Sequence, residues 1–219
     1  MSNINLNVPQ LGNRFYDYRK DCWGDSYNWD FQRSLTQVGY LVIHHSVTNP
    51  TGKDGKRQVD EIGEIHKSRG FSGFGYHFVI STDGIVWYVG DIGTGRANVA
   101  NHNEAVIGIC LVGDFTKHLP TDIQINSAHD LCDFFLFHYP SLKNVNDWDD
   151  VIGHKDAAQI WNDGSNKTAC PGSSWPNDMK WRITTNTVYT PSLTPLGEAQ
   201  KKIENYINLI KKINEMTKI

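Results

Sequence analysis

Short apolar runs separated by polar turns set the first structural expectations for this chain. Residues 40–43 and 106–112 are almost wholly apolar, which is typical of strands buried on both faces of a sheet. Residues 76–80 and 86–89 are two further strand candidates. The Thr-Asp-Gly sequence at 82–84 lies between them and predicts a tight hairpin turn, because Asp-Gly accepts the backbone angles that such turns require.

Two longer segments show helical rather than strand periodicity. Between residues 57 and 69 the apolar positions recur every three or four residues, and Gly70 is a typical helix stop. Residues 121–139 form a second candidate helix with one apolar side. Strands interspersed with helices predict an α/β fold with a mixed central β-sheet flanked by helices.

The two ends of the chain differ in composition from the middle. Residues 1–37 are rich in aromatic side chains, which we expect to pack on the main domain at 38–186; the alternative is an aromatic wall beside a substrate groove. Residues 187–196 contain Thr, Ser and Pro and predict a linker. Residues 197–219 predict an amphipathic C-terminal helix with a short heptad-like seam. This helix either docks on the main domain or joins two chains as a homodimer.

Side chains suited to metal binding occur in three motifs that are far apart in the sequence. His44 and His45 end the first apolar run, His154 follows the short apolar segment 151–153, and Cys170 precedes a Pro-Gly turn. Two imidazoles and one thiolate are good zinc ligands and leave one tetrahedral position for water, which zinc acidifies to a pKa of roughly 7. The motifs therefore indicate metal-assisted hydrolysis. On these residues alone, the alternative is a set of unrelated core histidines and a buried thiol.

Additional motifs extend this pattern over residues 38–182. The ordered set is His-His-Ser at 44–46, Gly-Tyr-His-Phe at 75–78, Asn-His-Asn at 101–103, Ile-Gly-Ile-Cys-Leu-Val-Gly at 107–113, Gly-His-Lys-Asp at 153–156 and Thr-Ala-Cys-Pro-Gly at 168–172. This set resembles that of zinc-dependent N-acetylmuramoyl-L-alanine amidases, the amidase-2 group that includes phage lysozyme-amidases and peptidoglycan recognition proteins. The resemblance implies the fold of that group and hydrolysis of the amide between N-acetylmuramic acid and L-alanine in peptidoglycan.

The resemblance also implies one zinc ion per chain and a particular set of ligands. These ligands are His44, His154 and Cys170. Strand alternation alone does not choose between His44 and His45, because neighbouring side chains simply point to opposite faces. The family uses the first histidine of the pair, which leaves His45 as a structural neighbour at the edge of the substrate site.

Catalytic roles follow from the same resemblance. Tyr76 matches a tyrosine that reaches the attacking water or the substrate carbonyl, although by itself it is also typical of a core aromatic residue. Thr168 or its neighbour Lys167 is expected to face the developing oxyanion. Amidases of the bacterial recycling branch carry a glutamate base where this chain has Cys110, so the chain is expected to be of the tyrosine type, with Cys110 in the core.

Four residues are candidates for contact with the muropeptide. These are Asn101 and His102 in a polar loop, His66 in the first candidate helix, and His45. The main alternative function is a non-catalytic peptidoglycan-binding module, which would be expected to have lost the cysteine ligand. A different zinc hydrolase, such as a stem peptidase, would be expected to carry a His-Glu-x-x-His helix or a clear glutamate base.

Composition excludes several classes of partner. The formal charge of −3 and the hydrophobic content of 39% indicate a globular protein without the basic face that nucleic acids require. The four cysteines show no paired spacing, which argues against a disulfide framework. No segment is long and apolar enough for a membrane span, and the N-terminus lacks the features of a secretory signal. We therefore expect cytoplasmic synthesis and action on the cell wall, as for a phage endolysin released by a holin.

Overall fold

The computed structural model describes residues 3–24 and 31–187. The chain divides into two units, Met1–Val188 and Tyr189–Ile219. All but the first residue of the expected linker at 187–196, and the whole expected helix at 197–219, lie outside the described residues. None of the described helices is long and apolar enough to cross a membrane.

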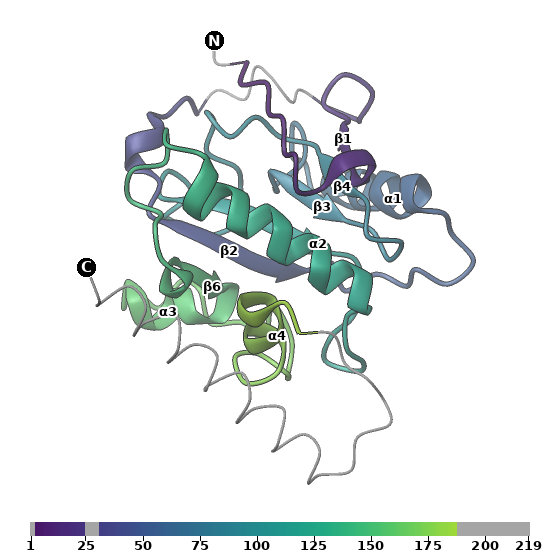
Figure 1. Ribbon diagram of the computed structural model, residues 1–219. Coiled ribbons are helices and arrows are strands. Elements are labelled where there is room, and N and C mark those ends of the chain that lie inside the picture. Colours follow the sequence, from purple (N-terminus) through teal and green to yellow (C-terminus); the bar gives the residue numbers. More distant parts are fainter. Residues whose placement is uncertain (1–2, 25–30, 188–219) are drawn as a thin grey trace, which may run out of the picture. The chain divides into compact units, whose positions relative to one another are not determined.

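The centre of the fold is a six-stranded mixed sheet (Figure 1). Its strands are β1 (Phe15–Asp17), β2 (Tyr40–His45), β3 (Phe78–Ile80), β4 (Val86–Tyr88), β5 (Val106–Leu111) and β6 (Val151–Gly153). They lie in the order β1-β4-β3-β5-β2-β6. β3, β5, β2 and β6 are parallel neighbours, whereas β4 is antiparallel to β3 and parallel to β1. The expected mixed sheet with flanking helices is confirmed.

Within residues 3–24 and 31–187, four α-helices accompany the sheet. They are α1 (Gly55–Ser68), α2 (Asp122–Asp133), α3 (Ala157–Ile160) and α4 (Met179–Thr185). The two long helices begin at polar caps: the Asp54 side chain accepts the Arg57 N–H, and Thr121 forms a reciprocal capping box with Gln124. The predicted second helix does not run uniformly to residue 139, because α2 passes into a π-helix at Phe134–His138.

Alternating strand residues separate two hydrophobic layers. Phe78 and Ile109 pack with α2 residues such as Leu131, and Figure 1 shows α2 running across this face of the sheet. Val79 and Cys110 pack instead with α1 residues. Since successive strand side chains point to opposite faces, the parity of each position decides which layer it joins. His44 has the parity of Val42 and therefore lies away from the α2 layer.

The N-terminal part of the chain joins the same sheet. β1 pairs with β4 as the outer strand, and Tyr18 behind it is 2% exposed. The Tyr18 ring lies edge-on to Trp87, with 5.2 Å between ring centroids. Tyr27 and Trp29, which belong to the same aromatic-rich segment, lie outside the described residues.

Candidate metal centre

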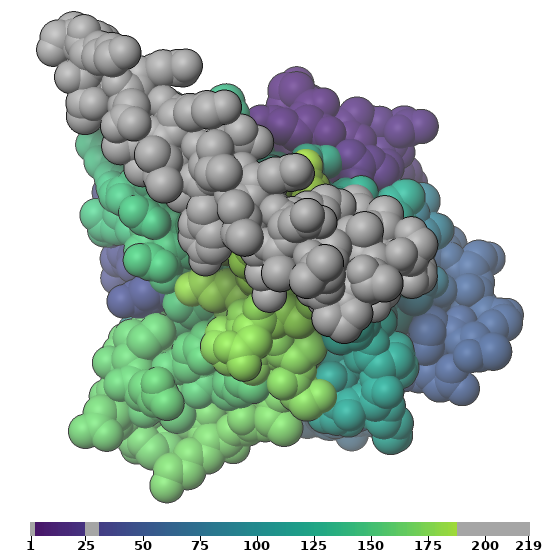
Figure 2. Space-filling model, turned by 60° about the horizontal axis from the view of Figure 1, so that its bottom comes forward, coloured from purple at the N-terminus to yellow at the C-terminus, as the bar shows by residue number. Residues whose placement is uncertain are grey.

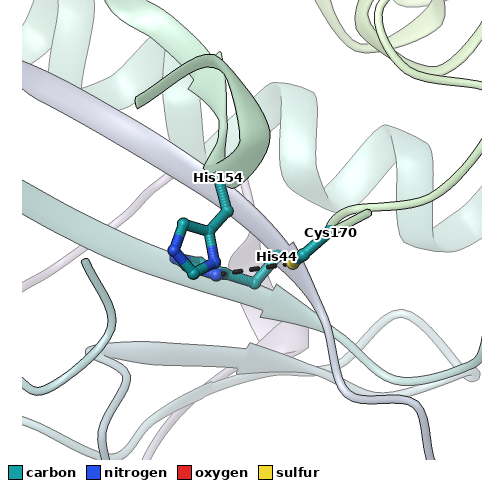
Figure 3. Close-up of side chains that lie close together, drawn as sticks. All are labelled: His44, His154 and Cys170. Carbon is teal, nitrogen blue, oxygen red and sulfur yellow. Dashed lines mark hydrogen bonds between the residues drawn. The ribbon is translucent and has the colours of Figure 1, made fainter. Parts of the chain in front are cut away.

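Three segments that are distant in the sequence meet at one point, and the parallel pairing of β2 with β6 brings two of them together. His44 is the fifth residue of β2, and His154 begins a 3-10 turn (His154–Asp156) directly after β6, the strand beside β2. Cys170 comes from the loop between α3 and α4. Figure 3 shows the three side chains converging from these elements, and one ligand atom of each lies within 4.8 Å of the others.

The spacing of these atoms fits a tetrahedral zinc site. His44 Nδ1 lies 3.6 Å from Cys170 Sγ. Zinc bonds of about 2.3 Å to sulfur and about 2.0–2.1 Å to nitrogen, at a tetrahedral angle, place the two ligand atoms about 3.5–3.6 Å apart. The donor set of two imidazoles and one thiolate is also one that zinc prefers. The residues present therefore fit the metal that the sequence implied.

The cysteine loop is attached to the turn that carries the second histidine. The Lys155 N–H donates to the Cys170 carbonyl at 2.8 Å, and Lys155 Nζ donates to the Gly172 carbonyl at 3.0 Å. Asp156 Oδ2 accepts the Gly153 N–H at 2.8 Å and Trp175 Nε1–H at 2.6 Å. These bonds hold His154 and Cys170 in place relative to each other before any metal binds.

Burial prepares the two imidazoles for metal binding but opposes ionisation of the thiol. It lowers the pKa of His44 well below the usual range and also lowers that of His154, so both rings are neutral at pH 7. Burial raises the pKa of the Cys170 thiol to about 12, although the His45 backbone N–H and Lys155 act in the opposite direction. A bound cation reverses this effect, because metal-ligating thiols are deprotonated.

Tyr76 lies beside the cluster. Its ring centroid is 5.1 Å from that of His44 and 5.4 Å from that of His66, and the side chain is half-buried. Burial, followed by the nearby thiols of Cys110 and Cys170, raises the pKa of Tyr76 well above its usual value. The phenol therefore stays protonated at neutral pH and can act as a hydrogen-bond donor. Cys110 is in register with His44 and contacts Tyr76, so it borders the site from within the core.

Two of the expected substrate contacts are buried away from solvent. The His45 side chain is 6% exposed, and its Nδ1 accepts the Phe115 N–H at 3.1 Å, on the α2 side of the sheet. His66 is 5% exposed, and its Nδ1 accepts the Gly75 N–H at 3.2 Å. The structure therefore makes His66 a support for the Tyr76 ring, whereas His45 contributes its backbone N–H to Cys170 Sγ at 3.4 Å.

The other expected contacts lie nearer the surface. Asn101 is exposed, and His102 Nε2 lies at hydrogen-bond distance, 2.7 Å, from Asp163 Oδ2. Lys167 and Thr168 are both exposed. Thr168 Oγ1 accepts the Cys170 N–H at 3.1 Å, which leaves its hydroxyl proton free to point outward.

Two asparagines beside the site were not predicted from the sequence. Asn98 Oδ1 lies 3.2 Å from His44 Nε2, and Asn166 Oδ1 lies 3.3 Å from His154 Nε2. Both side chains are buried, at 8% and 2% exposure. Asparagine in polar loops is common, so no pattern in the sequence distinguishes these two from the others.

Comparison with known proteins agrees with this geometry. The family described as Amidase_2, N-acetylmuramoyl-L-alanine amidase, matches residues 34–173. The chain belongs to this family. The matched region contains all three candidate metal ligands, and the family supports an amidase activity for the chain.

Curated relatives include both animal and phage proteins. Peptidoglycan-recognition protein LB of Drosophila melanogaster is 26% identical over 199 residues, which cover 82% of this chain and 79% of the relative. The endolysin of Escherichia phage T7 is 37% identical over 82 residues, which cover 37% of this chain and 51% of the endolysin.

Among solved structures, amidase LysC of Clostridium intestinale has a similar fold. It is 27% identical with a TM-score of 0.54, and the match covers 74% of this chain and 97% of that one. The space-filling view in Figure 2 shows one face of the present chain, with the segment around residues 150–165 in green, α4 in yellow-green and α1 in blue.

Proposed function

We propose that this chain is a zinc-dependent hydrolase of the amide bond between the lactyl group of N-acetylmuramic acid and L-alanine in peptidoglycan, with residues 38–186 as its catalytic domain. The observation that carries the proposal is the cluster of His44, His154 and Cys170 in the amidase family match. A recognition module without catalysis has no need of a buried donor set at zinc spacing.

The three ligands would hold one zinc ion. Such an ion supplies Lewis acidity to a substrate carbonyl and lowers the pKa of water at its open coordination position. Residues of the chain supply the hydrogen bonds to the substrate. The ring of Tyr76 packs against His44 and His66, and its hydroxyl lies near the thiols of Cys110 and Cys170. There the phenol donates a hydrogen bond to the carbonyl oxygen on which negative charge develops.

Thr168 is the second donor that the geometry favours. Oγ1 accepts the Cys170 N–H with one lone pair, so the hydroxyl still has its own proton to donate to the substrate. Lys167 is exposed next to it and supplies positive charge at the same rim. A Thr168→Ala variant is expected to lose more kcat than Lys167→Ala.

The relatives support a biological role in degradation of the cell wall. Phage endolysins are among the relatives of this chain, so we propose that it acts as an endolysin on the cell wall after release by a holin. Pairing of chains through residues 197–219 stays a prediction that concerns residues outside the described range.

Digestion of purified peptidoglycan by the zinc-loaded protein tests the function. Mass spectrometry is expected to find free stem peptides with an L-alanine amino terminus, and Cys170→Ser is expected to abolish their release. Cys22→Ser is the matched control, because Cys22 is half-buried in the cluster around Tyr18 and lies outside the metal site. Wall that binds the wild-type protein yet stays uncleaved would establish a recognition module instead.

A further inference from the structure

The two candidate histidine ligands share one arrangement of hydrogen bonds. Each ring meets an asparagine Oδ1 at its Nε2 atom, and each asparagine is buried. We infer that Asn98 and Asn166 are positioning residues, which hold His44 and His154 in the Nε2–H tautomer so that both Nδ1 atoms face the metal. The inference rests on the proposed zinc site.

The orientation of the Asn98 amide follows from its second hydrogen bond. Its Nδ2 donates to the Arg96 carbonyl at 2.6 Å, which turns Oδ1 toward His44. An amide oxygen only accepts, so His44 Nε2 must carry the proton. A neutral imidazole has a single N–H, and Nδ1 therefore carries the lone pair. It is this Nδ1 that lies 3.6 Å from Cys170 Sγ.

The orientation of the Asn166 amide is fixed even more strictly, because it forms hydrogen bonds with both the backbone N–H and the backbone carbonyl of Ala100. Its Oδ1 accepts the Ala100 N–H at 3.0 Å, and its Nδ2 donates to the Ala100 carbonyl at 3.1 Å. Reversing the amide would break both bonds. The same Oδ1 accepts from His154 Nε2, which leaves His154 Nδ1 free for the metal.

One loop, residues 96–103, therefore orients two candidate ligands, one from β2 and one from the turn after β6. Asn98 belongs to this loop, and Asn166 is bound to its residue Ala100. Two further contacts attach the segment of Asn166 to the loop. The ring of His102 stacks on that of Trp161 with 4.2 Å between centroids, and His102 is paired with Asp163.

Gly108 on β5 provides the space for the Asn98 amide. A Cβ atom at position 108 would lie 2.6 Å from Asn98 Oδ1 and 3.1 Å from its Nδ2, closer than van der Waals contact allows. Gly108 is in register with Val42 and carries no side chain that could bind metal. Gly108→Ala therefore displaces the amide without removing any hydrogen-bonding group, and it is an independent probe of the same contact.

Zinc affinity, measured by competition with a chromophoric chelator, is the first readout. Loss of a hydrogen bond behind a metal ligand typically lowers affinity 10–100-fold, and we expect this range for Asn98→Ala, Asn166→Ala and Gly108→Ala. Asn98→Asp keeps an acceptor toward His44 and is expected to recover most of the affinity. Asn144→Ala is the matched control, since it removes a 2.6 Å bond to the Thr36 carbonyl outside the site.

Histidine tautomers in the metal-free protein are the second readout, measured by long-range 1H–15N NMR. Wild type is expected to show the Nε2–H form for both ligands, and Asn98→Ala a mixture for His44 alone. If the asparagines had a purely structural role, their substitution would lower the free energy of unfolding but leave the tautomers and the tetrahedral cobalt(II) spectrum unchanged. Unchanged zinc affinity in Asn98→Ala and Asn166→Ala, or an Nδ1–H form in wild type, would overturn the inference.

Neither measurement depends on substrate. If the protein binds zinc through these tautomers but releases no stem peptide, the proposed amide hydrolysis fails while the positioning role stands. If stem peptides are released but each histidine is a mixture of tautomers, the positioning role fails while the proposed amide hydrolysis stands.

Discussion

His44 Nδ1 lies 3.6 Å from Cys170 Sγ, although 126 positions separate the two residues in the sequence. Such a pair exists only in the folded chain, so zinc is expected to bind the folded state in preference to the unfolded one. A ligand that binds only the folded state stabilises it by about 4.1 kcal/mol at one thousand times its Kd. Zinc is therefore expected to raise the free energy of unfolding in urea by this order, and Cys170→Ser to remove most of the increase.

Zinc binding is also expected to release one proton. At about pH 6.5, below the pKa of roughly 7 typical of zinc-bound water, the neutral imidazoles of His44 and His154 are favoured because burial lowers their pKa values. The Cys170 thiol, whose pKa is raised to about 12, must lose its proton to become a ligand. Isothermal titration in buffers of different ionisation enthalpy measures this number. A release near zero would mean that Cys170 does not bind as a thiolate.

Tyr76→Phe is expected to separate catalysis from metal binding. Removal of one donor to a developing oxyanion costs about 2.7–4 kcal/mol, or 10²–10³ in kcat. The phenylalanine ring keeps the packing against His44 and His66, so zinc affinity and KM are expected to change little. Steady-state kinetics on a soluble muropeptide gives both parameters. Equal kcat in the two proteins would exclude Tyr76 from the reaction.

His66 is expected to make stability depend on pH. Burial, with a smaller effect of Arg69, lowers its pKa to about 4 from an unfolded value near 6.5. The unfolded chain therefore binds more protons between these values, so stability is fully present above about pH 6.5 and falls as the pH drops toward 4. The difference is worth up to about 3 kcal/mol.

Urea unfolding of the zinc-free protein between pH 4 and 7 tests this linkage. His66→Gln is expected to show a shallower dependence than wild type, and the difference between the two curves isolates His66 from the other buried histidines. Parallel curves would show that His66 titrates alike in the folded and unfolded chain.

Arg33 is expected to be the side chain that contributes most to holding the polar loop before β5 in place. Its guanidinium donates to the carbonyl oxygens of Ile92, Asn103, Glu104 and Val106. An unpaired buried carbonyl costs about 1–3 kcal/mol, so Arg33→Met is expected to lose about 3 kcal/mol or more of unfolding free energy. Arg57→Met removes an exposed pair with Glu64 and is expected to lose under about 1 kcal/mol. Urea unfolding of both variants compares the two losses.

Local pattern accounts for most of the secondary structure. The apolar run at 40–43 corresponds to β2, the Asp-Gly turn to the antiparallel β3–β4 pair, and the helical period at 57–69 to α1. The helix at 121–139 was predicted as uniform, but its last turn is a π-helix. Periodicity reports which side of a segment is apolar and is insensitive to a change of hydrogen bonding within one turn.

The sequence by itself determined the fold class and the family and indicated three candidate metal donors, because apolar period and motif order can be read directly along the chain. Strand alternation did not choose between His44 and His45, and only the resemblance to the family favoured His44. The packed layers then show which face of the strand meets His154 and Cys170. The sequence did not indicate Asn98 and Asn166. Their role depends on hydrogen bonds between loops, and such bonds are set by how distant segments meet in the folded chain.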